Sequence, residues 1–451
     1  VITKMESSQV IGVNVSDVLT TAKNFNFNQG INAKYKLDSV GSEWTTDLSY
    51  TLSPNETQQS FVSGNGKLEN NLNFFAAQTN LLKKMKKDIT VETGLKTTLV
   101  GFHNTTDYYR HAGGISTSDS LRSGAYSYKE SINAAFVQAS KKFSGIILKV
   151  GTRLENTNMD GHQKTPVDTS FSIHRTDLFP YVYLSRTIMK IAGYDLRAYL
   201  VYRRTINRPS YEYLNPASRI IDPYLFETGN PFLRPQFTQN YEANVSVDER
   251  PLIAFGINNT KDIFTQVIYQ ADTNSMVSKR TYDNLGSNRE HYIRFMGAIP
   301  PGGKYFFVVG GQYNHNFYEG MYENKPLSYK KGSWTLYTYH QLKLGSLTQV
   351  SVNGFVRFNG QQQFYELSTF GELRMSINQQ FLKKKLNVTV SMNDIFQTNH
   401  NEFILNQGSV KAYGLRESDT RRFGLNVRYN FGWKKKDEST DLNNYTPDKI
   451  N

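Results

Sequence analysis

The feature that most constrains this chain is a strict alternation of apolar and polar residues near its C-terminal end. Residues 423–433 read F-G-L-N-V-R-Y-N-F-G-W, so every second residue from Phe423 to Trp433 is apolar. Successive side chains of a β-strand point to opposite faces, which predicts a strand with one apolar, aromatic face and one polar face. In a soluble sandwich the apolar face packs on a core, whereas in a membrane barrel it faces lipid.

The same alternation recurs along the chain. It is clearest in residues 146–155, 305–318 and 386–393, and it is also present near residues 31–37, 44–52, 91–99, 196–202, 350–358 and 373–377. No stretch of comparable length has the i, i+3, i+4, i+7 spacing of an amphipathic helix. Nor does any run of about 18 apolar residues provide a transmembrane helix. The chain is therefore predicted to be all-β.

The connections between the predicted strands alternate in length, which favours a membrane barrel. Short connections fall at residues 38–42, 82–88, 142–145, 191–195, 248–251, 300–304 and 382–385, and longer polar ones near residues 53–69, 103–125, 157–172, 207–236 and 397–419. Short periplasmic turns and long extracellular loops are typical of outer-membrane barrels, and a sandwich has no reason to sort its loops in this way. The polar positions also include arginines that need water or a partner, as a lumen provides. These are Arg153, Arg197, Arg203, Arg357, Arg374 and Arg428.

We therefore predict a transmembrane antiparallel up-and-down β-barrel over residues 1–433, in the bacterial outer membrane and in contact with its lipid and lipopolysaccharide. A polar periplasmic tail, residues 434–451, is predicted to follow it. The chain begins V-I-T-K-M without an initiator methionine or a leader peptide. We expect it to be the C-terminal part of a barrel of about 22 strands with a plugged lumen, lacking its first strands and its N-terminal plug.

Composition argues against other classes of protein. The 451 residues include no cysteine, which excludes disulfide frameworks and thiolate metal sites. The net charge of +13 comes from short lysine clusters between strands rather than from a stripe on one helix, so nucleic-acid binding is not predicted. The histidines show no metal-binding spacing, and neither a nucleophile elbow nor G-x-G-x-x-G is found. A Ser/His pair built between strands, around His315 or His340, is an open alternative, but we predict no enzyme, cofactor or metal site.

Residues 201–216, V-Y-R-R-T-I-N-R-P-S-Y-E-Y-L-N-P, and 222–236, D-P-Y-L-F-E-T-G-N-P-F-L-R-P-Q, carry a family resemblance. With S-M-N-D-I-F-Q-T-N at 391–399 and N-N-T-K-D-I-F-T-Q-V at 258–267, the chain resembles the outer-membrane β-barrel family at the C-terminal end of many TonB-dependent receptors of Bacteroidota. The resemblance implies a barrel that surrounds a plug and imports a nutrient or chelate ligand with energy transmitted by the TonB protein through that plug. A surface lipoprotein or another outer-membrane complex subunit is a further possible partner. The alternative is a plugless barrel that serves as a structural subunit of a larger complex or as a passive pore.

Two groups of residues are candidates for ligand binding. The first lies in the external segment after Arg203, where Pro209 and Pro216 stop the strand and Ser210 is predicted to cap one helical turn through Leu214. The second is a set of lumenal arginines that would attract an anionic cargo. The predicted ligand-binding residues are Arg203, Arg208, Tyr211, Tyr213, Arg234, Arg153 and Arg197. A structural alternative is that the segment only folds over the barrel mouth or packs on the plug, and that the arginines pair with plug acids or with Glu92 and Glu155.

Overall fold

The computed structural model describes residues 2–431, apart from residues 7–8, 15–16, 121, 166–167, 192, 217, 223–224, 248–249, 271–276, 299–302, 363–364, 408–409 and 417. Trp433 and the predicted tail, residues 434–451, lie outside the described residues. The chain divides into two compact units. The first comprises residues 1–187, 199–241 and 259–287, and the second comprises residues 188–198, 242–258 and 288–451.

The described chain is almost entirely β-strand. The first unit holds β1 (Ile2–Glu6), β2 (Gln9–Asn14), β3 (Val18–Asn24), β4 (Phe27–Lys36), β5 (Glu43–Phe61), β6 (Gly64–Met85), β7 (Ile89–Ala112), β8 (Ile115–Ser118), β9 (Gly124–Phe143), β10 (Ile146–Thr165), the helical turn α1 (Tyr211–Leu214), β13 (Arg219–Asp222) and β14 (Leu225–Glu227). Both units share β11 (Thr169–Ile191), β12 (Tyr194–Asn207), β15 (Gln236–Val247), β16 (Arg250–Gln270) and β17 (Ser278–Ala298). The second unit holds β18 (Tyr305–Tyr322), β19 (Lys325–Lys343), β20 (Thr348–Arg357), β21 (Gly360–Gln362), β22 (Tyr365–Leu367), β23 (Phe370–Phe381), β24 (Leu386–Asn393), β25 (Asn401–Gln407), β26 (Val410–Arg416) and β27 (Arg422–Tyr429).

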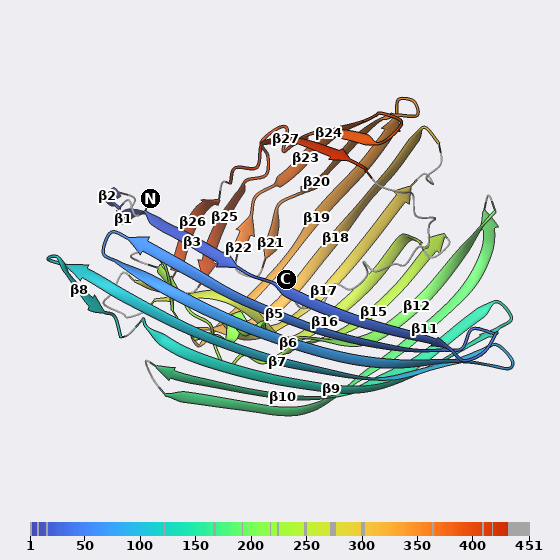
Figure 1. Cartoon of the computed structure of the whole chain (residues 1–451), viewed down its shortest axis with the longest axis horizontal. Helices are drawn as coiled ribbons and strands as arrows, with labels where there is room; N and C mark the ends of the chain where they lie inside the picture. Colours follow the sequence, from blue (N-terminus) through green and yellow to red (C-terminus); the bar gives the residue numbers. More distant parts are fainter. Residues whose placement is uncertain are drawn as a thin grey trace. The chain divides into compact units, whose positions relative to one another are not determined.

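Consecutive long strands pair antiparallel within each unit. In the first unit, β4 to β7 and β9 to β11 form one continuous series of neighbours, and β5, β6, β7, β9 and β10 lie side by side in Figure 1. In the second unit, β18, β19, β20, β23, β24 and β27 form a similar series. One short parallel pairing, between β14 and β17, departs from this rule. The strand order is that of an up-and-down barrel, so the predicted fold class is confirmed.

The two faces of β10 meet different surroundings. On β10, Glu155, Thr157 and Met159 are buried, whereas Leu154 and Asn156 between them are exposed. We call the buried face of the first unit inner and the exposed face outer. On β27 of the second unit, Leu425 is 64% exposed and its apolar neighbours Phe423 and Val427 are exposed as well. A sandwich would cover this apolar face, so the sandwich alternative is wrong.

The connection predicted at residues 142–145 is short, as the sequence predicts. Between β9 and β10 the turn consists of Ser144 and Gly145, whose φ angles of 47° and 78° are both positive, as a two-residue hairpin requires. The polar segments predicted as long connections differ from expectation, because much of their length is strand. Residues 53–61 continue β5, 103–112 continue β7, and 157–165 continue β10. Among the described residues, no helix is long and apolar enough to cross a membrane.

Candidate functional site: the connection between β12 and β15

Residues 208–235 join β12 to β15 and fold onto the inner face of the first unit. Pro209 and Pro216 bracket the single helical turn α1, since proline cannot continue a strand ladder. The predicted turn through Leu214 is therefore confirmed. The predicted cap is wrong, because the Ser210 hydroxyl makes no capping hydrogen bond. Instead, the Ser210 carbonyl accepts hydrogen bonds from the amides of Tyr213 (3.0 Å) and Leu214 (3.3 Å).

Two leucines anchor this connection. Leu214 and Leu233 are fully buried in one cluster with inward residues of β7, β9 and β10, namely Phe102, Tyr126, Tyr128 and Met159. Full burial of a leucine side chain contributes about 1.5–3 kcal/mol. The connection is therefore part of the packed core of the first unit.

Aromatic rings and one glycine fix the path of the connection. The Tyr211 ring packs 4.6 Å from that of Phe102, and the Tyr213 ring stacks 4.0 Å from that of Tyr282 on β17. Two segments of the connection meet where the amide of Gly229 donates to the Asn215 carbonyl (2.8 Å). A Cβ atom at residue 229 would lie 2.4 Å from that carbonyl oxygen, so only glycine fits here. This close approach accounts for the glycine of the G-N-P sequence at 229–231.

A buried ion pair ties the start of the connection to the barrel wall. Arg208, whose side chain is only 6% exposed, pairs with Glu155 of β10, which is 1% exposed. Its guanidinium also donates to the Thr157 hydroxyl at 3.0 Å. Arg153 pairs with the same carboxylate. Burial lowers the pKa of Arg208, but an arginine stays charged in proteins, so the carboxylate of Glu155 in the ion pair and the nearby charge of Glu130 neutralise it.

A second ion-pair cluster lies further along the connection. One carboxylate oxygen of Glu227 accepts from Arg219 of β13 (2.7 Å) and from Arg280 of β17 (2.6 Å). Burial acts to raise the pKa of Glu227, but the hydrogen bonds and charges of the two arginines outweigh it and hold the pKa below its ordinary value. At neutral pH this cluster therefore fastens β13 and β14 to β17.

The predicted ligand-binding residues are thus only partly brought together. Arg153 and Arg208 share Glu155, which is the pairing that the structural alternative names. Arg203 donates to Asn240 at 3.2 Å, and the exposed Arg234 pairs with Asp262 at 2.9 Å. Arg197 lies on the part of β12 that belongs to the second unit.

Tyr211 and Tyr213, by contrast, line a cavity of about 410 Å³ between the connection and the inner face of β5 to β7. Its other lining groups are mostly amides, hydroxyls and carboxylates, including Asn55, Thr57, Asn70, Asn104, Glu212, Arg219 and Glu227. Sequence reasoning missed the three asparagines. They occupy inward positions of strands whose outward positions are also polar, so no alternation marks them.

His315 and His340, the residues of the open catalytic alternative, contact tyrosines on β18. A ring nitrogen of His340 lies 2.6 Å from the Tyr305 hydroxyl, and one of His315 lies 3.1 Å from that of Tyr313. Within the described part of the chain, no group of three or more His, Asp or Glu side chains is placed to hold a metal ion.

An antiparallel barrel order, an exposed apolar face and an inner face that buries charges define an outer-membrane β-barrel. The chain belongs to the outer membrane protein beta-barrel family, whose sequence profile matches residues 35–429. This family places it in the bacterial outer membrane. No curated protein matches the chain in sequence.

Solved structures with the same fold are outer-membrane receptors. The ferric yersiniabactin uptake receptor FyuA of Yersinia pestis aligns with a TM-score of 0.63 and 13% identity, over 91% of this chain and 62% of its own. The siderophore receptor PiuA of Acinetobacter baumannii aligns with a TM-score of 0.62 and 10% identity, over 90% of this chain and 64% of its own. The pyoverdine receptor FpvA of Pseudomonas aeruginosa aligns with a TM-score of 0.61 and 13% identity, over 91% and 62%. The chain thus spans less than two thirds of these receptors.

Proposed function

We propose that the chain is the barrel of a TonB-dependent receptor, of the type found in Bacteroidota, that imports a nutrient or chelate ligand across the outer membrane. The observation that carries this proposal is the connection between β12 and β15, which packs into the inner side of the wall and encloses a cavity there. A passive pore has no need of such an obstruction, whereas a gated importer needs both a ligand site and a closed lumen. The energy-coupling TonB protein, acting through a plug, and a surface lipoprotein are proposed partners.

The cavity suggests what the ligand offers. Its asparagines and threonine supply neutral donors and acceptors, and its tyrosines supply flat apolar surfaces. The arginines around it are engaged by carboxylates, namely Arg208 by Glu155 and Arg219 by Glu227. An anionic cargo would have to compete with those carboxylates. We therefore propose that amide and hydroxyl contacts, with Tyr211 and Tyr213, hold the ligand.

The test begins with a strain that lacks the gene. The growth of this strain is compared with that of the parent when a ferric chelate, cobalamin, an oligosaccharide or a peptide is the sole source of the nutrient concerned. Uptake of the nutrient that the strain fails to use is then measured. We expect the double variant Tyr211→Ala with Asn104→Ala to lower uptake about tenfold, which corresponds to roughly 1.4 kcal/mol of lost binding. We expect a protonophore to abolish uptake by the wild-type protein.

Two results would count against the proposal. Uptake that survives the protonophore would indicate a passive pore, and the absence of any nutrient phenotype would favour a structural subunit. The intact mass of the protein from its native membrane provides an independent check. A receptor with a plug must exceed the 51.6 kDa of this chain.

A further inference from the structure

The outer face of the first unit changes its chemistry between two adjacent rows of side chains. The strand register aligns Leu154, Ala135, Leu95, Thr79 and Thr46 in one row across five neighbouring strands, β10, β9, β7, β6 and β5. Toward the short turns, which are periplasmic, the outward face of β10 continues past Thr152 with the apolar residues Val150, Leu148 and Ile146. On β9 and β10 this row is therefore the upper border of the lipid-facing band, whereas on β7 and β5 the exposed apolar residues Leu99 and Leu48 extend the band farther.

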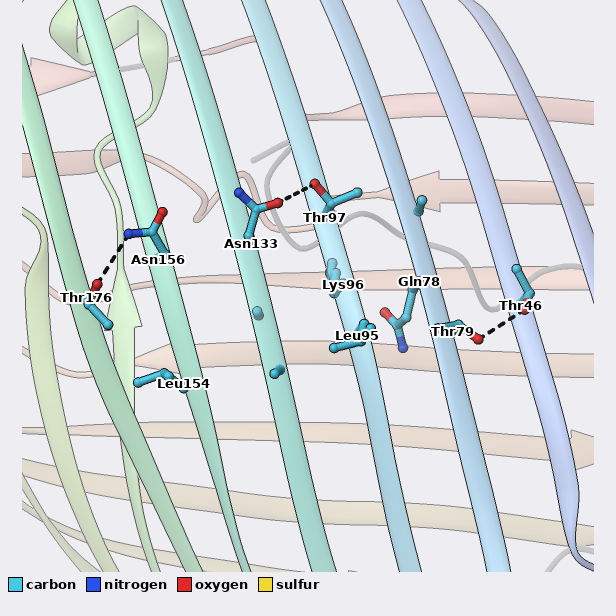
Figure 2. Close-up of a pocket in the computed structure, with 13 residues that line it drawn as sticks. Thr46, Gln78, Thr79, Leu95, Lys96, Thr97, Asn133, Leu154, Asn156 and Thr176 are labelled. Carbon is cyan, nitrogen blue, oxygen red and sulfur yellow. Dashed lines mark hydrogen bonds between the residues drawn. The ribbon is translucent and has the colours of Figure 1, made fainter.

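The next row, farther from the short turns, is polar over four adjacent strands. The register aligns Thr176 of β11, Asn156 of β10, Asn133 of β9 and Thr97 of β7. Asn156 donates to Thr176 at 3.2 Å, and Thr97 donates to Asn133 at 2.8 Å. Figure 2 shows these two bonded pairs above Leu154 and Leu95.

A groove of about 660 Å³ lies where the two rows meet. Ala135 stands between Leu95 and Leu154, which are 60% and 50% exposed and form ridges on either side of it. Because alanine is small, the strand surface is lowered along β9 between the two ridges. The groove is open to the outer side and is roofed by the amides and hydroxyls of the polar row (Figure 2).

We propose that this groove binds one acyl chain of an outer-leaflet glycolipid of the lipid A type. The groove continues the lipid-facing band, so its occupant is a membrane lipid. The amide or hydroxyl group at the top of an acyl chain linked to glucosamine would meet Asn133 and Asn156. The exposed Lys129, four residues from Asn133 on the same face of β9, would meet a phosphate on the sugar. Asp160, opposite Lys129 in the register, accepts a hydrogen bond from Ser172 at 2.6 Å.

The order of chemistry along β9 carries this assignment. With increasing distance from the short turns, the outer face of β9 presents Ala135, then Asn133, then Ser131 and then Lys129. Asn133 donates to Ser131 at 3.2 Å. An acyl chain, its amide or hydroxyl, the sugar and the phosphate follow one another in the same order in a lipid A molecule. A phospholipid lacks the amide, the 3-hydroxyl and the sugar, so beyond the apolar floor of the groove its ester carbonyls and phosphate would offer hydrogen-bond acceptors only.

The experiment measures lipid retained by the full-length protein purified from its native outer membrane in mild detergent. The readout is 3-hydroxy fatty acid and phospholipid per mole of protein, with barrel folding checked by heat-modifiable electrophoretic mobility. Ala135→Trp fills the groove and is expected to lower retained 3-hydroxy fatty acid about tenfold, a loss that corresponds to roughly 1.4 kcal/mol. Val182→Trp, an outward position of β11 away from the groove, is the matched control and should retain the wild-type amount.

The double variant Asn133→Leu with Asn156→Leu removes the amides that roof the groove. It replaces Ala135→Trp as the test if that variant does not fold. It is expected to lower the 3-hydroxy fatty acid while leaving phospholipid unchanged. Equal retention by wild type and by the groove variants would overturn the proposal, as would a loss confined to phospholipid.

Discussion

The two faces of β10 solve opposite problems with the same backbone. Its inner face buries Glu155 and Thr157, and each of these polar groups contacts Arg208. Its outer face leaves Leu154 half exposed, because lipid rather than protein covers it. A polar group buried on the inner face is tolerated only when it has hydrogen-bond or ion-pair partners, whereas on the outer face the depth of a position in the membrane decides which residues are tolerated.

Removing the carboxylate of Glu155 tests the inner face most severely. Glu155→Ala leaves Arg208 buried without the carboxylate that pairs with it, which typically costs about 3–5 kcal/mol, and the charge of Glu130 offsets only part of that loss. We expect residues 208–235 to detach from the wall while the strands remain paired. Hydrogen–deuterium exchange of the amides of Tyr213 and Gly229 would report this detachment as a large loss of protection.

The double variant Glu155→Gln with Arg208→Met sharpens the same test. It removes both buried charges, and such replacements are often neutral. Arg153, the other partner of Glu155, has a side chain that is 42% exposed and can turn to water. Protection should therefore largely return. If Glu155→Ala alone left the exchange protection of the Tyr213 and Gly229 amides unchanged, the ion pair would not be what holds the connection.

Leu214→Ala tests apolar packing on the same inner face. Leu214 is fully buried against rings from the wall, and large-to-small changes at such positions cost about 2–5 kcal/mol. We expect a lower thermal midpoint for loss of protection in residues 208–235. Phe232→Ala is the matched control, because Phe232 is 64% exposed and belongs to the same connection. Equal effects of the two variants would show that the buried cluster does not anchor this segment.

An arginine scan along β10 tests the outer face. Val150, Leu154 and Asn158 are alternate outward positions on that face, from within the lipid-facing band to above it. Arginine costs about 2–4 kcal/mol at the bilayer midplane and about 0–1 near the interfaces. Unfolding in lipid vesicles should thus show the largest destabilisation at Val150, less at Leu154 and nearly none at Asn158. A flat series would contradict the assigned border between apolar and polar rows.

The sequence predicts the two-faced strands well, because alternation with a period of two is a local signal. It fails where β10 rises above the lipid. There the outward residues Asn156 and Asn158 are polar, so both faces are polar and residues 157–165 look like a loop although the ladder continues. The outer face loses its apolar signal before the strand ends.

The candidate site was predictable only in part. Pro209, Ser210 and Pro216 mark the helical turn locally, and Arg208 stands out as a charge in a proline-rich connection. That Glu155 is its partner follows from the fold, since nothing near Arg208 in the sequence identifies it. The cavity asparagines Asn55 and Asn104 are likewise brought to one site only by the pairing of β5, β6 and β7.

The rule that buried polar groups need partners extends to the second unit, and Asp394 tests it there. Asp394 follows β24 and is fully buried. Its carboxylate accepts from the amides of Thr398 (2.9 Å) and Asn399 (3.2 Å) and from the Thr420 hydroxyl (2.5 Å). Burial acts to raise the pKa of Asp394, but these hydrogen bonds and the charge of Arg421 outweigh it, so the pKa lies below its ordinary value.

A depressed pKa gives this carboxylate a defined pH dependence. Its stabilisation is fully present above the unfolded pKa of about 3.9 and is lost as the pH falls through the lower folded pKa. Asp394→Asn removes one acceptor and should cost about 1–3 kcal/mol at pH 7. The thermal midpoint of wild type should exceed that of the variant at pH 7, and the gap should narrow below pH 4. Asp419→Asn, at an exposed position, is the control and should show no gap at either pH. Because every other carboxylate titrates equally in both proteins, a gap that stays constant down to pH 2 would show that Asp394 acts through its shape rather than through its charge.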